Sequence, residues 1–206
     1  MRAGVFGGTF DPIHLGHLAA ARSIQTTLKL DKVIFVPAGQ PWMKAGMPVS
    51  PVKDRVEMVR LAVARRKAFE LSTIEADRPG PSYAVDTMDM LRRQWGTGAD
   101  LFFLLGSDAL TDIVKWREPQ RLIRLCRLVA FARPGVRLPA MVNLEAAVPG
   151  VTHRLIFVDV PQRDVKATAI RQRIAEGRSI QRLVPRAVEK YILERGLYGA
   201  ASRRTT

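Results

Sequence analysis

The sequence predicts an α/β fold, a doubly wound parallel sheet with a small helical C-terminal appendage. Short, continuous apolar runs recur along the 206-residue chain, as at residues 33–36 and 101–105. Runs of this kind are typical of parallel strands that are covered on both faces. Segments whose apolar residues lie three or four apart alternate with these runs, which favours helices packed on both sides of one sheet.

Six segments have the pattern of strands. The first ends at Gly7 and Gly8, the second is bounded by Asp31 and Pro37, and the fourth stops at Gly106. Glycine and proline at these ends interrupt a strand and begin a turn. We therefore expect strands over residues 3–6, 32–37, 69–74, 101–105, 128–131 and 155–158.

Helical spacing is clearest after the first strand, where Leu15, Leu18, Ala21 and Ile24 share one face. Gly177 and Gly196 are placed as helix C-caps. We expect helices over residues 15–28, 50–64, 83–95, 108–114, 119–125, 168–175 and 186–194. Residues 38–49 are predicted as a loop, 134–153 as the least structured segment, and 203–206 as frayed. One domain should span residues 1–206, with its helical C-terminal part at about 165–198.

The composition is that of a soluble globular protein, with 47% hydrophobic and 25% charged residues. No apolar run approaches the ~18–20 residues that would cross a bilayer, and the N-terminus passes directly into a glycine cluster without the apolar stretch of a signal peptide. Cys126, the single cysteine, has no partner for an internal disulfide. We expect a reduced, cytoplasmic protein.

The chain is strongly basic, with 33 Lys and Arg against 19 Asp and Glu and a formal net charge of +14. Such a surplus fits nucleic acid, an anionic membrane or small phosphorylated substrates as partners. The arginines are spread through predicted helices, however, and three Tyr and three Trp provide little surface for base stacking. We expect neither nucleic acid nor a membrane as partner, and a homodimer stays open.

The most informative segment is residues 7–17, Gly-Gly-Thr-Phe-Asp-Pro-Ile-His-Leu-Gly-His. It joins the first strand to its helix, which is the usual ligand position in an open α/β sheet. Gly7 and Gly8 allow a bulky anion close to the backbone, and the helix N-terminus favours negative charge. His14 and His17 are three residues apart, so they share a face on a helix. Two imidazoles there can donate hydrogen bonds to phosphate oxygens.

Other ligands fit this segment less well. A zinc pair would need further ligands, but His153 is the only other histidine and no H-E-x-x-H pattern is present. Neither G-x-G-x-x-G nor G-x-x-x-x-G-K-[ST] occurs. We therefore expect a phosphate site of a different kind, without a metal held by the protein.

Residues 7–17 resemble the G-G-T-F-D-P-x-H-x-G-H signature of the nucleotidylyltransferase superfamily. More narrowly, the chain from Arg2 to about Tyr198 resembles the bacterial nicotinate-nucleotide adenylyltransferases. This resemblance implies a Rossmann-like fold and the joining of nicotinate mononucleotide to ATP. It also implies Mg²⁺ bound mainly through the ATP phosphates.

Later motifs carry the narrower resemblance. The first two are the P-x-x-x-P-x-x-K loop, which ends at Lys44, and the helix that carries Arg55. The others are a segment at 81–87 similar to P-S-Y-T-x-D-T, the pattern G-x-D-x-L followed by Trp116, and R-P-G at 133–135. The resemblance implies that Lys44 reaches substrate phosphate and that Trp116 stacks on the pyridine ring. It implies catalytic roles for His14, His17 and Arg171. Nicotinate mononucleotide is expected to bind at Lys44, Tyr83, Ala84 and Trp116, and ATP at Gly7, Gly8, Thr9, Phe10, Gly106, Asp108, Arg133, Lys166 and Thr168.

The sequence departs from the family at its last motif, which usually contains [IV]-S-S-T-x-I-R. Here Lys166 and Ala167 replace both serines, while Thr168 and Arg171 match. Loss of one hydroxyl is worth ~1–3 kcal/mol if it serves a charged phosphate. We hypothesise that the Lys166 ammonium offsets this loss. Ala84 likewise stands where the family has a threonine, a donor near the nicotinate carboxylate.

The expected reaction is attack of the acceptor's 5′-phosphate on the α-phosphorus of ATP, without a covalent intermediate, so that Cys126 is dispensable. Nicotinamide mononucleotide and phosphopantetheine stay open as acceptors, and a cytidylyltransferase would differ by using CTP. A non-catalytic nucleotide- or RNA-binding module would show salt-dependent RNA affinity and no pyrophosphate release.

Overall fold

The computed structural model describes residues 1–132, 140–161 and 165–200. In these residues, six parallel strands form one sheet in the order β3-β2-β1-β4-β5-β6. The strands are β1 (Arg2–Gly8), β2 (Lys32–Pro37), β3 (Phe69–Leu71), β4 (Asp100–Gly106), β5 (Arg127–Phe131) and β6 (Leu155–Val158). The predicted doubly wound parallel sheet is therefore confirmed, and its order reverses between β1 and β4.

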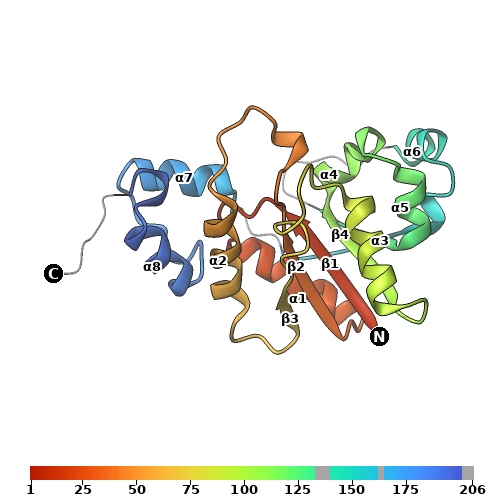
Figure 1. The fold of residues 1–206 in the computed structure, drawn as a ribbon, viewed down its shortest axis with the longest axis horizontal. Coiled ribbons are helices and arrows are strands. Elements are labelled where there is room, and N and C mark those ends of the chain that lie inside the picture. The colour runs from red at the N-terminus through yellow and green to blue at the C-terminus, as the bar shows by residue number, and fades with distance from the viewer. Residues whose placement is uncertain (133–139, 162–164, 201–206) are drawn as a thin grey trace.

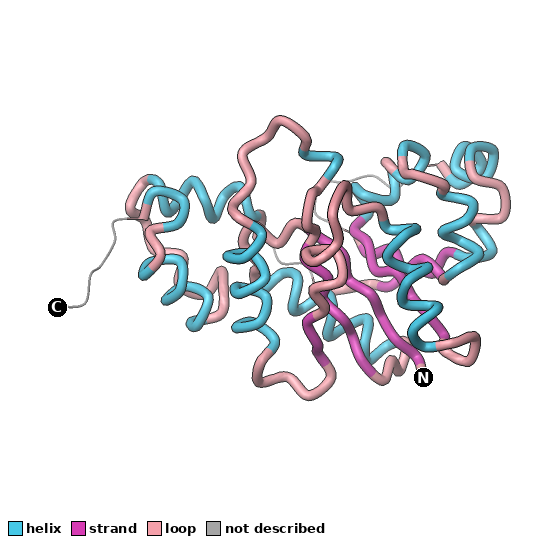
Figure 2. The backbone as a smooth tube through the Cα atoms, in the orientation of Figure 1, coloured by secondary structure: helices cyan, strands magenta, loops and turns pink. Residues whose placement is uncertain are grey.

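The α-helices of the described residues are α1 (Leu15–Thr27), α2 (Val52–Val63), α3 (Ala84–Trp95), α4 (Ser107–Thr111), α5 (Pro119–Leu125), α6 (Met141–Ala147), α7 (Ala167–Ala175) and α8 (Arg186–Glu194). Short 3-10 helices occur at Trp42–Lys44, Ile113–Lys115, Thr152–Arg154 and Leu197–Gly199. In Figure 1, α3 to α6 gather on one side of the sheet, and α2, α7 and α8 on the other. Figure 2 shows the connection from β2 to α2 as a long loop that rises from the sheet.

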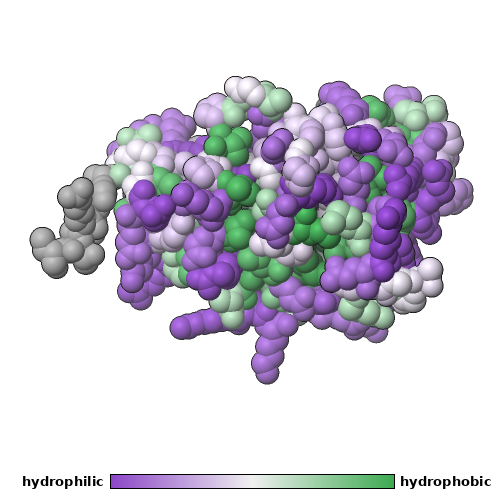
Figure 3. Space-filling view, viewed as in Figure 1, coloured by the Kyte–Doolittle hydropathy of each residue, from purple (hydrophilic) through white to green (hydrophobic). Residues whose placement is uncertain are grey.

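Two apolar cores lie on opposite faces of the sheet because strand side chains alternate between them. On β2, Val33 and Phe35 belong to the core under α1 and α2, whereas Ile34 and Val36 belong to the core under α3 and α5. Burial on both faces explains why these strands are continuous apolar runs. In Figure 3, hydrophilic residues cover the outer parts of this view and hydrophobic residues gather in its middle.

The helical C-terminal part packs on the first of these cores. Ile170 and Ile174 of α7, together with Val188 and Ile192 of α8, are buried in the same cluster as Phe6 of β1. Gly177 and Gly196 follow the ends of α7 and α8 with φ of 67° and 60°. These positive φ values fit glycine just after a helix C-cap, as the sequence predicts.

Several predicted elements need correction. The segment 134–153, predicted as the least structured one, contains α6 and the start of a 3-10 helix within its described residues. The third strand ends at Leu71 instead of residue 74, and the helix expected at 108–114 is two shorter ones, α4 and a 3-10 helix. Part of the predicted loop at 38–49 is the 3-10 helix Trp42–Lys44.

Cys126 is buried at the end of α5, where its Sγ donates to the carbonyl of Leu122 at 3.4 Å. Burial raises the pKa of this thiol to about 12. The thiol does not line the cavity described below, so a role for it as a nucleophile has no support in the structure.

Candidate active site

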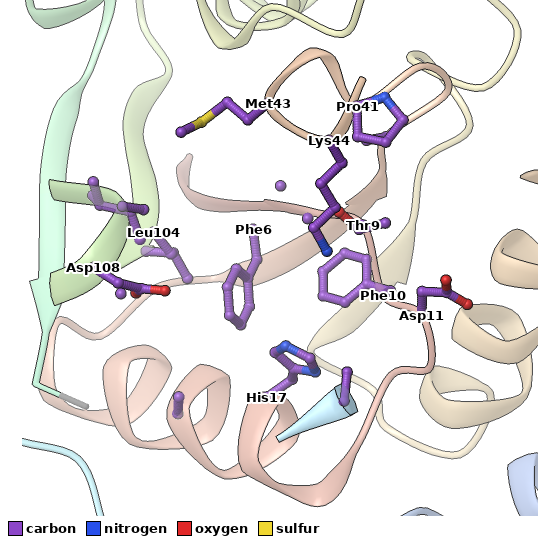
Figure 4. Close-up of a pocket in the computed structure, with 18 of the residues that line it drawn as sticks. Phe6, Thr9, Phe10, Asp11, His17, Pro41, Met43, Lys44, Leu104 and Asp108 are labelled. Atoms are coloured by element: carbon purple, nitrogen blue, oxygen red, sulfur yellow. The ribbon is translucent and has the colours of Figure 1, made fainter. Parts of the chain in front are cut away.

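A cavity of about 740 Å³ opens at the carboxyl ends of β1 and β4, where the strand order reverses. This is the ligand-binding position of doubly wound sheets, and its volume falls within the ~300–1,000 Å³ of small-molecule sites. Figure 4 shows His17 pointing into it from α1 and Lys44 from the opposite wall, with Asp108 at one side. Fifteen of the predicted site residues line it: Gly7, Gly8, Thr9, Phe10, His14, His17, Lys44, Tyr83, Ala84, Gly106, Asp108, Trp116, Lys166, Thr168 and Arg171. Arg133, the remaining one, lies outside the described residues.

The two histidines form a stacked pair at the start of α1. Their ring centroids are 3.6 Å apart at an interplanar angle of 21°. His14 is the N-cap, with extended backbone, so it stands just outside α1, and His17 lies in the first turn of that helix. The rings cap each other's backbone: His14 N–H donates to His17 Nδ1 at 3.2 Å, and His17 N–H donates to His14 Nδ1 at 3.4 Å.

This reciprocal capping decides where the ring protons lie. An Nδ1 that accepts a hydrogen bond carries no proton, so each neutral imidazole carries its proton at Nε2. Phe10 packs edge-on against His17, with centroids 5.1 Å apart, and limits rotation of the ring. The pair therefore presents Nε2–H donors from a fixed position at a helix N-terminus, an arrangement suited to phosphate oxygens.

Aromatic side chains form one end of the cavity. Trp116 packs edge-on against Phe103 with centroids 5.7 Å apart, and Tyr83 lies 5.9 Å from Trp42. The guanidinium of Arg117 lies 4.9 Å from the centroid of the Tyr83 ring and also lines the cavity. Sequence reasoning missed Arg117, although its place directly after Trp116 was a usable signal.

The other end of the cavity is formed by the start of α7. Lys166 is the N-cap of this helix and makes no side-chain capping bond, and Thr168 lies in its first turn. Arg171 donates from Nη1 to the backbone carbonyl of Asp11 at 2.8 Å. A cation at a helix N-terminus is unfavourable in the absence of a nearby anion.

Arg55 holds the loops of the cavity together from behind. Its side chain is buried, and its guanidinium donates to the carbonyls of Ala38 at 2.6 Å, Ser50 at 2.9 Å, Thr9 at 3.0 Å and Gly39 at 3.1 Å. Burial lowers the pKa of Arg55 from its usual value. Three separate segments of the chain meet at this one side chain.

A second buried network supports the aromatic end. Thr87 donates from its hydroxyl to Glu75 at 2.6 Å, and Ser82 Oγ accepts from the backbone N–H of Gly39 at 2.9 Å. Burial raises the pKa of the Glu75 carboxyl. Gly39 approaches this network so closely that an added Cβ would lie 2.2 Å from the Glu75 carbonyl oxygen, so only glycine fits. No pattern in the sequence pointed to Glu75.

Metal-ligating groups do not gather in the part of the chain that the structure describes: no three His, Cys, Asp or Glu residues there could hold one ion. Among the same residues, no helix is both long and apolar enough to span a membrane.

The fold and this cavity define a nucleotidyltransferase of the cytidylyltransferase-like family, whose model matches residues 5–173. A relative from Thermus thermophilus is 48% identical over 96% of this chain and 100% of its own length. A relative from Thermomicrobium roseum is 44% identical over 96% of this chain and 91% of its own length. Both are described as probable nicotinate-nucleotide adenylyltransferases. The chain belongs to the nicotinate-nucleotide adenylyltransferase family.

Solved structures share the fold of this chain. A Plasmodium falciparum nicotinic acid mononucleotide adenylyltransferase, solved in complexes with APC and with NaAD, matches at a TM-score of 0.78. The match covers 97% of this chain and 98% of that one at 16% sequence identity. The shared architecture thus extends over both the sheet and the helical C-terminal part.

Proposed function

We propose that this chain joins nicotinate mononucleotide to the adenylyl group of ATP, giving nicotinate adenine dinucleotide and pyrophosphate in NAD biosynthesis. Membership of the family supports this activity. The observation that supports this activity best is the cavity at the switch point of the sheet. The stacked His14–His17 pair lines this cavity together with an aromatic end at Trp116 and a cationic end at Arg171.

In the proposed reaction, a 5′-phosphate oxygen of nicotinate mononucleotide attacks the α-phosphorus of ATP. The new oxygen–phosphorus bond forms as the bond from the α-phosphorus to the α,β-bridging oxygen breaks, and pyrophosphate leaves with that electron pair. Phosphoryl transfer of this kind depends on positioning and charge stabilisation more than on a protein nucleophile. We assign that work to the Nε2–H groups of His14 and His17.

The roles of the remaining residues follow from their places in the cavity. We assign Lys166 and Thr168 at the start of α7, together with Arg171 in its middle, to the β- and γ-phosphates, and Lys44 to the acceptor phosphate. The ATP side would also include Gly7, Gly8, Thr9, Phe10, Gly106 and Asp108, with Arg133 assigned to it from sequence alone. Mg²⁺ bound to the triphosphate would neutralise charge on the leaving pyrophosphate. ATP oxygens and water would hold the ion, in keeping with the preference of Mg²⁺ for phosphate and water ligands.

We assign Tyr83, Ala84 and Trp116 to the pyridine ring, and Arg117 to its carboxylate. Ala84 offers no side-chain donor, whereas the Arg117 guanidinium lines the same end of the cavity above Tyr83. A guanidinium binds a carboxylate more strongly than a neutral amide. Arg117 therefore favours nicotinate over nicotinamide mononucleotide.

The Arg117→Gln variant should lose about tenfold in preference for nicotinate over nicotinamide mononucleotide, because one charge-assisted hydrogen bond is worth ~1.5–3 kcal/mol. The measurement is kcat/KM for both acceptors. The matched control is Arg121→Gln, which removes a nearby arginine paired with Asp89 at 3.1 Å and outside the cavity. An unchanged acceptor preference in Arg117→Gln would remove this residue from the acceptor site.

The Lys166→Ala variant should raise KM for ATP by about 3–10-fold, an effect of ~1 kcal/mol for a cation near a phosphate at the protein surface. The free protein should lose no thermal stability, because the change removes a cation from a helix N-terminus. The control Arg173→Ala lies on the same helix outside the cavity. Equal KM values for wild type and Lys166→Ala would contradict the phosphate role.

Pyrophosphate release tests the proposed function directly. The assay uses ATP and Mg²⁺ with nicotinate mononucleotide, nicotinamide mononucleotide or phosphopantetheine as acceptor, and CTP in place of ATP as a further arm. Release with ATP and nicotinate mononucleotide, at a preference of roughly tenfold or more, is expected. Folded protein that binds ATP but releases no pyrophosphate with this acceptor would overturn the proposal.

We further propose that the chain forms one domain and works in the cytoplasm. Support for one domain comes from the core that α7 and α8 share with β1. The buried, free thiol of Cys126 fits a reducing compartment.

A further inference from the structure

Asp11 lies within the segment 7–17 but turns away from the phosphate-binding groups. Figure 4 shows its carboxylate directed away from His17 and Lys44. The residue is 4% exposed. A buried carboxylate is costly unless hydrogen bonds satisfy it. The groups that donate these hydrogen bonds therefore show which parts of the protein Asp11 connects.

Three segments hold Asp11 at three different atoms. Tyr198 donates its hydroxyl to Oδ1 at 2.6 Å, and the Ser50 N–H donates to Oδ2 at 3.1 Å. Arg171 donates from Nη1 to the backbone carbonyl at 2.8 Å. The Tyr198 side chain is partly buried, and desolvation together with Asp11 raises the pKa of its phenol, which therefore stays protonated as a donor at neutral pH.

Arg171 and Tyr198 thus contact the same residue at different atoms, Arg171 at the backbone carbonyl and Tyr198 at the carboxylate. Arg171 lines the cavity, whereas Tyr198 does not. One Arg171 nitrogen is held by the Asp11 carbonyl, and this bond restricts the orientations that the rigid guanidinium can take. If the Asp11 side chain lost its tyrosine partner, only the Ser50 N–H would still hold its carboxylate, and the carbonyl that contacts Arg171 would be less firmly positioned.

A second contact ties the same parts of the molecule together. The N–H of Leu15, the first residue of α1, donates to the carbonyl of Leu183 at 2.9 Å. The C-terminal part therefore touches the segment 7–17 on both sides of the His14 N-cap. Its contribution to the site therefore extends beyond Lys166, Thr168 and Arg171, which line the cavity.

We propose that Tyr198 is a positioning residue for ATP, acting through Asp11 on Arg171. This proposal rests on the assignment of Arg171 to the ATP phosphates. A Tyr198→Phe variant should raise KM for ATP by about 3–10-fold, the range expected for one misaligned charge-assisted bond. KM for nicotinate mononucleotide should stay within about twofold of wild type, since Tyr198 does not line the cavity and its hydroxyl bonds to Asp11 and Met58, not to a residue assigned to the acceptor.

Tyr191 provides a matched control. Its hydroxyl donates to the buried carboxylate of Asp54 at 2.7 Å, in the same C-terminal part but outside the cavity. Tyr191→Phe therefore removes the same kind of bond as Tyr198→Phe. Both variants should lose similar thermal stability, and only Tyr198→Phe should change KM for ATP.

A double-mutant cycle tests the route through Arg171. In an Arg171→Ala background, Tyr198→Phe should leave KM for ATP unchanged, because the group on which Tyr198 acts is gone. The proposal is overturned if Tyr198→Phe behaves like Tyr191→Phe, if it raises both KM values equally, or if its effect persists in the Arg171→Ala background. Direct ATP binding is measured by calorimetry without an acceptor. This measurement tests the role of Tyr198 in ATP binding even if the proposed reaction does not take place.

Discussion

Replacing His17 with alanine is expected to lower kcat for adenylyl transfer by about 10²–10³-fold, the usual cost of losing one donor to transition-state charge. KM for ATP should rise less, because the Nε2–H group is aimed at charge that develops during the reaction. Steady-state kinetics with varied ATP measure both constants. Equal changes in kcat and KM would count against a transition-state role, and a raised KM with kcat unchanged would assign His17 to substrate binding alone.

His17 also caps the backbone of His14, so the alanine variant mixes two losses. Two further variants separate them. Asparagine places an oxygen near the position of Nδ1 and preserves the cap, whereas glutamine places an amide donor near the position of Nε2 and gives up the cap. If catalysis depends on Nε2–H, His17→Gln retains more activity than His17→Asn, while His17→Asn retains more thermal stability. The reverse order of activities would mean that the cap, and not the donor, serves catalysis.

Replacing Arg55 with methionine is expected to destabilise the protein by ~3–5 kcal/mol, since four backbone carbonyls lose their donor. Methionine removes the cost of burying a cation but cannot satisfy those carbonyls. For a chain of this size the melting temperature should fall by about 10 °C. KM should rise for both substrates as well, because the loops at Thr9 and Ala38 line the cavity.

Arg60 provides the comparison for Arg55 on the same helix. It is exposed and pairs with Glu57 at 2.6 Å, and exposed ion pairs contribute little to stability. Arg60→Met should therefore lower the melting temperature by no more than about 4 °C. Calorimetry measures the melting temperatures of both variants. Equal melting temperatures would show that water replaces the Arg55 guanidinium without loss of stability.

The sheet could be predicted from sequence because its strands are apolar on both faces. β2 and β4 are continuous runs of large apolar residues, so their position needed no knowledge of their neighbours. The helix α6 was missed because it buries only Leu144, while Val142 is 80% exposed, and this leaves no apolar stripe. Hydrogen bonds from Gly150 and Thr152 to Glu145 stabilise its end instead, and they lower the pKa of that carboxyl to about 2.

The residues that line the cavity were largely predictable, and those that hold them in place were not. His14, His17 and Arg171 stand in motifs with recognisable order and spacing. Asp11 and Tyr198 are separated by 187 positions, and no local pattern reports that a tyrosine so distant reaches a buried aspartate. Long-range contacts of this kind depend on the folded packing of α7 and α8. The contacts of Arg55 with four backbone carbonyls were likewise not predictable from the sequence.

The burial of Cys126 makes the natural chain suitable for site-specific labelling. Maleimides react with thiolates, and a thiol with a pKa of about 12 is almost entirely protonated at neutral pH. A cysteine introduced at Met47, which is 62% exposed on the loop beside the cavity, would therefore take up a fluorophore while Cys126 stays in place. A dye at that position would report ligand entry optically, in the otherwise unaltered sequence.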